Sequence, residues 1–139
     1  MGAWGLGPFD NDDAADLAGE LESLDDSAGL EALIAALGAV DGEYIEADEG
    51  ARAVAAAEVV AGIVGQPGPT TSYNEAAMGW IQRTSPPSNG ALVDFALAVL
   101  ERVMGEASEL AELWDDAGEP WSDSVSELSG RLRAGRPAS

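Results

Sequence analysis

The chain has 139 residues, 46% of them hydrophobic, which suits one folded domain with a buried core and argues against wholesale disorder. Six arginines, no lysine and 26 acidic residues give a formal net charge of −20, so binding to nucleic acid or to an anionic membrane surface is disfavoured. With no cysteine and no histidine, the chain lacks disulfides, thiol chemistry and the commonest general base and metal ligand.

The N-terminus carries no basic region or apolar run of the kind found in signal peptides. The longest apolar stretch, AVAAAEVVAGIVG, is too short to span a bilayer and is interrupted by a glutamate. We therefore expect a cytoplasmic protein. We also expect a single helical domain over residues 1–135 and a frayed tail over residues 136–139.

The chain opens with MGAWGLGPFDNDDAAD, in which three glycines and a proline predict an extended lead-in before the first helix. Trp4 and Phe9 are its only large side chains, and we expect them to pack into the helical core. Asp10 is placed to cap the first helix, and Asp12 and Asp13 then fall in its first turn, where the helix dipole favours negative charge. Capping therefore accounts for the acidic run, and the spacing does not match an EF-hand calcium loop.

Apolar residues recur at helical spacing along the whole chain, and the alternation typical of strands is almost absent. This pattern predicts seven helices, separated by breaks such as GQPGPTT and RTSPPSNG, over residues 11–24, 26–40, 46–65, 72–81, 91–104, 108–117 and 121–132. The third is apolar on nearly every side, so we expect it to be central and buried. The predicted fold is all-α, a compact antiparallel bundle in which Trp80, Trp114 and Trp121 contribute to the core.

Glu58 is the only charged residue within the apolar stretch of the third helix. A buried carboxylate without a partner is strongly unfavourable. We therefore expect an ion pair with a basic residue of a later helix, for which Arg83 and Arg102 are the candidates. The alternatives are a solvent-facing glutamate and an active-site acid.

Glu46, Asp48 and Glu49 form the densest group of carboxylates, at the start of the third helix. Glu46 and Glu49 share a helix face and, with Asp12 or Asp13, could hold a hard cation such as Mg²⁺ or Ca²⁺. Acidic residues in a first turn are also what the helix dipole favours, and this interpretation needs no metal. A third possibility is a partner-binding surface made of all five residues.

Three blocks of sequence, MGAWGLGPFDNDDAAD, YIEADEGARAVAAAEVVAG and SELAELWDDAG, occur in this order along the chain. In these blocks the chain resembles a bacterial family, domain of unknown function 4259, which is common in actinobacteria. The resemblance covers essentially the whole chain apart from residues 66–89. It implies a small helical protein without an established biochemical role, and structural roles for the motif residues Trp4, Phe9, Asp10, Asn11 and Trp114.

The residue types left for catalysis are carboxylates, tyrosine and arginine, and they single out no catalytic residue, metal site or cofactor. All 14 acidic residues of positions 1–50 precede the first base, Arg52, so this part of the chain is strongly negative. The sequence therefore favours a non-enzymatic binding protein, an immunity- or antitoxin-like partner or an inhibitor, that engages a basic protein such as a toxin or nuclease. Alternatives are a carboxylate-dependent metal-binding enzyme, and an accessory protein of a biosynthetic or defence operon that binds a small apolar ligand. A charge that serves only solubility is a further interpretation.

Overall fold

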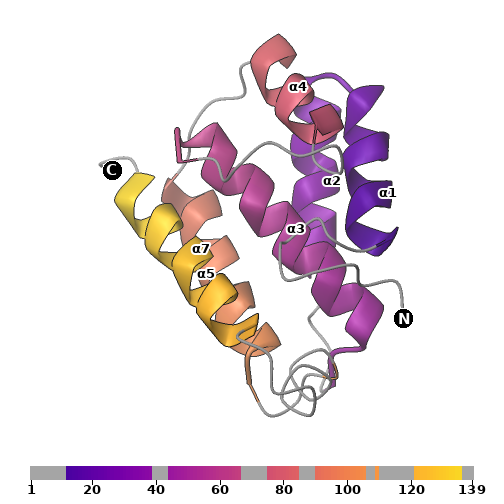
Figure 1. Ribbon diagram of the computed structural model, residues 1–139. Helices are drawn as coiled ribbons and strands as arrows, with labels where there is room; N and C mark the ends of the chain where they lie inside the picture. The colour runs from indigo at the N-terminus through magenta and orange to yellow at the C-terminus, as the bar shows by residue number, and fades with distance from the viewer. Residues whose placement is uncertain are drawn as a thin grey trace.

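The computed structural model describes residues 12–38, 44–66, 75–84, 90–105, 109 and 121–135 (Figure 1). Regular structure in these residues is helical and includes no β-strand. The helices are α1 (Asp12–Glu22), α2 (Asp26–Gly38), α3 (Ala47–Ile63), α4 (Glu75–Thr84), α5 (Gly90–Val103) and α7 (Trp121–Gly135).

Helix α3 is the centre of the fold. Every residue from 53 to 61 is buried, and α3 packs against α1, α2, α4, α5 and α7. In Figure 1, α1 and α2 lie on one side of α3 and α5 and α7 on the other. Alanine dominates the helix, and its small side chain lets the neighbouring helices approach the α3 backbone closely. The prediction of a central, buried third helix is confirmed.

The core is completed by one apolar face of each surrounding helix. Helix α1 contributes Leu17 and Leu21, and α7 contributes Leu128 and Leu132, all with none of their surface exposed. The step of four residues places each pair one turn apart on the same helix face. Burial of a leucine side chain stabilises a fold by about 1.5–3 kcal/mol, so these faces hold α1 and α7 against α3.

The connection between α1 and α2 is closed by Asp25. One carboxylate oxygen of Asp25, Oδ1, accepts a hydrogen bond from the backbone N–H of Ala28 at 2.7 Å, so Asp25 caps α2. Asp26 and Ser27 are also residue types that cap helices, but the cap of α2 lies before both of them. The carboxylate of Asp26 accepts instead from the neighbouring N–H of Ser27, at 2.8 Å.

Helix α4 is fixed to this same connection by two side chains. Trp80 is 1% exposed, and its indole Nε1 donates a hydrogen bond to the carbonyl oxygen of Asp25 at 3.2 Å. The guanidinium of Arg83 donates to the carbonyl oxygens of Glu22 and Leu24, at 2.9 and 3.2 Å. Carbonyl groups at a helix C-terminus have no partner inside the helix and favour a nearby positive charge. Arg83 therefore completes the end of α1 from a different helix.

Helices stand within a few residues of the predicted positions, and the all-α class is confirmed for the described residues. The fourth helix begins at Glu75 rather than Ser72 and runs to Thr84. The lead-in over residues 1–10 and all but Glu109 of the helix predicted over 108–117 lie outside the described residues. The total of seven helices, the antiparallel packing and the single-domain boundary at residue 135 stay predictions. Within the described part of the chain, none of the helices combines the length and apolar character needed to cross a bilayer.

Candidate functional site

The charged residues of α1 and α2 are all acidic. The apolar faces of the two helices turn toward α3, which leaves their acidic residues on the exposed side. Neither helix contains a basic residue. We define the acidic surface as the exposed carboxylates of this helix pair: Asp16, Glu20, Glu22, Asp25, Asp26 and Glu31.

Half of the acidic surface has a structural partner. Glu20 forms an ion pair with Arg52 of α3 at 2.7 Å, and Asp25 and Asp26 accept backbone hydrogen bonds at the start of α2. An exposed ion pair such as that of Glu20 and Arg52 contributes about 0–1 kcal/mol to the free energy of unfolding, so it holds α1 beside α3 only weakly. The other three, Asp16, Glu22 and Glu31, have no basic partner among the described residues.

Arginines that could neutralise this surface are directed elsewhere. Arg83 donates to the two carbonyl groups at the end of α1, and Arg131 lies against α3 on the side of α7. Only Arg52 reaches a carboxylate of the acidic surface in the described part of the chain. Arg52 and Arg83 keep their positive charge beside this helix pair, but the six carboxylates of the acidic surface outnumber them, so the field outside α1 and α2 is negative.

The start of α3 holds the acidic residues that the sequence suggested for cation or partner binding. The carboxylate of Glu49 accepts a hydrogen bond from the backbone N–H of Glu46 at 3.3 Å, and Glu46 in turn accepts from the backbone of Glu49, which together form a capping box. This geometry engages both residues in capping α3. No group of three or more acidic residues with the spacing of a metal site occurs within the described ranges.

The remaining predicted site residues are placed only in part. Asp12 and Asp13 lie in the first turn of α1 and Asp48 lies in the first turn of α3, but their side chains are not among those described. The motif residues predicted to have structural roles lie outside the described residues: Trp4, Phe9, Asp10, Asn11 and Trp114.

Glu58 is buried, with 3% of its surface exposed. Its Oε2 lies 2.8 Å from Nη1 of Arg131 in α7, and the same guanidinium contacts Glu127 at 2.7 Å and donates to the carbonyl oxygen of Gln66 at 3.1 Å. We expected Arg83 or Arg102 as the partner, and both were wrong. Arg83 is held at the end of α1, whereas α7 lies along α3 and brings Arg131 over Glu58.

Arg131 retains its positive charge in this position. Burial by itself lowers the pKa of the guanidinium, but hydrogen bonds and charge from Glu127 and Glu58 raise it by more, so the pKa lies above its ordinary value. The cation and its two carboxylates come from α3 and α7, and Gln66 follows the end of α3. The arrangement links the C-terminal part of α7 to α3, with the carboxylate of Glu58 buried and that of Glu127 exposed.

Two features were missed in the sequence. The first is the hydrogen bonding of Arg83 to the end of α1, for which the only sequence signal is a basic residue late in a short helix. The second is a hollow between α1 and α4, lined by Glu22, Glu75, Ala76, Gly79, Trp80 and Arg83. The sequence spacing of four residues places three of these residues on one face of a helix: Glu75, Gly79 and Arg83. The contribution of Glu22 could not be predicted, because it depends on how α1 and α4 pack.

The chain was compared with known proteins. No curated protein and no solved structure matches it. A family model described as a domain of unknown function, DUF4259, matches residues 2–124, so α7 beyond its first turn extends past the matched region. Because this match spans most of the chain, the protein belongs to the DUF4259 family.

Proposed function

We propose that this protein is a non-enzymatic binding protein that engages a basic protein partner through the acidic surface of α1 and α2. An immunity protein, an antitoxin or an inhibitor of a basic toxin or nuclease would work in this way. One observation carries the proposal: Asp16, Glu22 and Glu31 point outward without a basic partner in the described residues, while Arg83 and Arg131 are used in internal contacts.

The physical advantage of such a surface is the rate of association. Like charges gathered on one face attract an oppositely charged partner from a distance and orient it during encounter, which raises association rates by about 10–1000-fold. The same field repels nucleic acid and anionic membranes. Salt screens it over a distance of about 8–10 Å at physiological ionic strength, so the attraction should weaken as salt is added.

The test compares the wild-type chain with the double variant Asp16→Lys/Glu31→Lys. Both positions are exposed and neither caps a helix, whereas reversal of Glu46 would damage the capping box of α3. Each immobilised protein is used to capture partners from a native lysate at low and at high salt, and the association rate is then measured with each retained basic protein. We expect the variant to associate about tenfold more slowly at low salt, and the difference to shrink at high salt.

The control places the same change in net charge on α5 and α7. Ala98→Lys, Glu101→Lys and Ser126→Lys together raise the formal charge by four, as the double variant does, and all three positions are exposed. We expect the control to keep most of the wild-type association rate. Equal losses in both variants would assign the effect to total charge rather than to this surface. Identical partners and rates in all three proteins would leave the acidic residues with a role in solubility only, and would contradict the proposal.

A further inference from the structure

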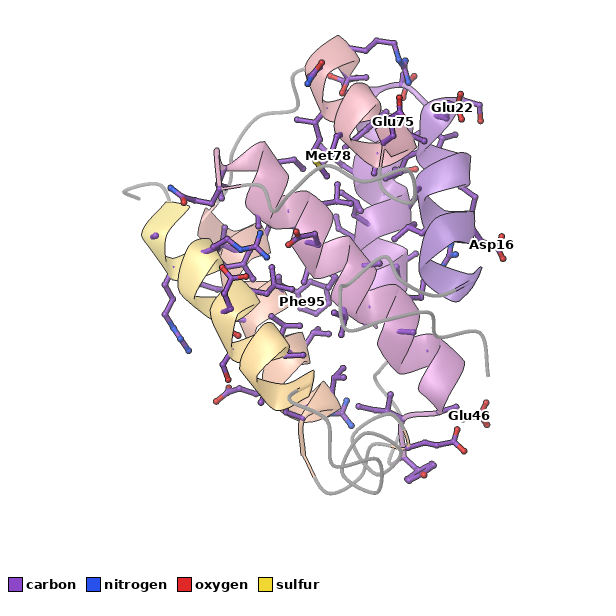
Figure 2. All side chains as sticks on the ribbon, in the orientation of Figure 1. Asp16, Glu22, Glu46, Glu75, Met78 and Phe95 are labelled. Carbon is purple, nitrogen blue, oxygen red and sulfur yellow. The ribbon has the colours of Figure 1, made fainter. Side chains whose placement is uncertain are left out.

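A hollow of about 500 Å³ opens beside the acidic surface, where the end of α1 meets α4. Figure 2 shows two of its glutamates, Glu22 of α1 and Glu75 of α4, close to each other at this end of the molecule. Ala76 and the nearly fully buried Trp80 contribute apolar surface to its lining. The hollow therefore combines apolar surface with two carboxylates.

On the side of α4, a glycine lines the hollow where another residue would place a side chain. Glu75, Gly79 and Arg83 occupy successive turns of that face, and the middle residue is a glycine. A Cβ built at Gly79 would meet no atom within 4 Å, so packing does not require a glycine there. Gly29 differs, because an added Cβ would overlap the ring of Trp80. Glycine is unfavourable inside a helix, and at Gly79 the space that a side chain would occupy is open.

The charges that line the hollow are not balanced from within. Neither Glu22 nor Glu75 has a basic partner among the described residues. Arg83 also lines the hollow, but its guanidinium is bound to the carbonyl oxygens of Glu22 and Leu24. Eight residues separate Arg83 from Glu75, which corresponds to about 12 Å along a helix. The carboxylate of Glu75 is therefore left for a cation that comes from outside.

We propose that this hollow receives an arginine side chain of the basic partner, an inference that rests on the function proposed above. The methylene groups of the arginine would lie on the apolar surface of Ala76 and Trp80, and its guanidinium would meet the carboxylates of Glu22 and Glu75. A planar guanidinium can form two parallel hydrogen bonds with one carboxylate, whereas a lysine ammonium cannot.

The experiment titrates the 139-residue protein with N-acetyl-arginine amide and follows the indole N–H signal of Trp80 and the backbone signals of Ala76 and Gly79 by NMR. N-acetyl-lysine amide and the uncharged N-acetyl-citrulline amide are the comparison probes. We expect saturable shifts at these three residues with the arginine probe, weaker shifts with lysine and none with citrulline. The double variant Glu22→Gln/Glu75→Gln should weaken binding of the arginine probe by about fivefold, since each exposed ion pair contributes modestly.

Two matched pairs of variants separate the hollow from the surrounding charge. Gly79→Leu fills the hollow without changing charge, and Gly19→Leu adds the same side chain at an exposed helical glycine of α1 that also has no atom near its Cβ. Asp16→Asn/Glu31→Gln removes as much charge as Glu22→Gln/Glu75→Gln but leaves the hollow intact. Loss of binding in Gly79→Leu and retention in Gly19→Leu and Asp16→Asn/Glu31→Gln would support the hollow as the arginine site.

Shifts that spread over all acidic residues and persist in Gly79→Leu, or no shifts at all, would overturn this inference. Neither result would decide the proposed function, because that depends on reversal at Asp16 and Glu31, which lie outside the hollow. Conversely, if reversal at Asp16 and Glu31 changes no association rate while the arginine probe still binds at Gly79, the hollow stands as a site and the broader electrostatic role fails.

Discussion

The indole ring of Trp80 lies directly against the backbone of Gly29, so closely that a Cβ on Gly29 would overlap ring atoms. Gly29 lies in the first turns of α2, and the same ring donates a hydrogen bond to Asp25, which caps that helix. Helix α4 therefore rests on the start of α2 through a glycine that leaves room for the ring. Trp80 is among the largest fully buried side chains in the described residues, so this contact positions both α4 and the hollow beside it.

We expect Gly29→Ala to destabilise the protein although alanine is the better helix former. The added methyl group must displace a buried indole, and overpacking of this kind costs about 1–3 kcal/mol of unfolding free energy. The matched control is Gly19→Ala, where the methyl group meets nothing within 4 Å and should stabilise α1 by about 0.5–1 kcal/mol. Urea unfolding of both variants measures the difference. A stabilised Gly29→Ala protein would mean that Trp80 does not occupy the position described.

The ion pair between Glu58 and Arg131 predicts that removal of one charged partner destabilises the protein more than removal of both. Replacement of Arg131 by methionine leaves Glu58 buried beside an apolar side chain, and the loss of one partner of a buried pair costs about 3–5 kcal/mol. The double variant Glu58→Gln/Arg131→Met removes both charges and should recover much of that loss. The cycle is completed by Glu58→Gln and measured by chemical unfolding. Equal stability of Arg131→Met and wild type would show that the pair does not hold α7 on α3.

Alkaline pH should leave the contribution of Arg131 intact. The pKa of Arg131 is higher in the folded protein than in the unfolded chain. The charged guanidinium therefore contributes its full stabilisation at any pH below the unfolded pKa. This contribution is lost only when the pH rises through the higher folded pKa. The difference in unfolding free energy between wild type and Arg131→Met should therefore stay constant from about pH 7 to about pH 10. A difference that falls steadily over this range would contradict a guanidinium held by Glu58 and Glu127.

Helical elements could be predicted because apolar periodicity within a single helix is a local property. The α3 stretch is a clear example, since a run of alanine and valine interrupted only by Glu58 indicates a central helix before any packing is known. The partner of Glu58 could not be found in this way. Arg83, Arg102 and Arg131 are all possible partners until the packing of α7 on α3 is known, and the choice is made by tertiary contacts alone.

The sequence indicates which residue types cap the helices, but it does not always indicate which of several neighbouring residues forms the cap. Before α2, three consecutive residues can each cap a helix: Asp25, Asp26 and Ser27. In the structure the cap is Asp25, whose carboxylate accepts the hydrogen bond from the N–H of Ala28. At the start of α3, the expected first-turn acidic residues became a capping box because Glu46 and Glu49 stand three residues apart. The hollow depends on Glu22 and Gly79 from two helices, so no local pattern could reveal it.

The capping box also gives the sharpest test of a cation at the start of α3. Glu49→Ala removes the side chain that accepts from the N–H of Glu46 and should cost about 0.5–2 kcal/mol of unfolding free energy, whereas glutamine at this position can still accept that hydrogen bond. Glu49→Gln should therefore lose only the interaction of its charge with the helix dipole, about 0.3–1 kcal/mol. Thermal and urea unfolding of the two variants distinguish these values.

Calorimetric titration of the same proteins with Mg²⁺, Ca²⁺ and Mn²⁺ then separates capping from metal binding. If the Glu49 carboxylate serves α3, wild type and Glu49→Gln should both give weak heats that do not saturate and that diminish with salt, as expected for cations attracted to an acidic surface. Glutamine keeps the hydrogen bond but is a poorer ligand for a hard cation than a carboxylate. A saturable one-to-one isotherm in wild type that disappears in Glu49→Gln, with the fold retained, would therefore assign Glu49 to a metal site and make the capping geometry secondary.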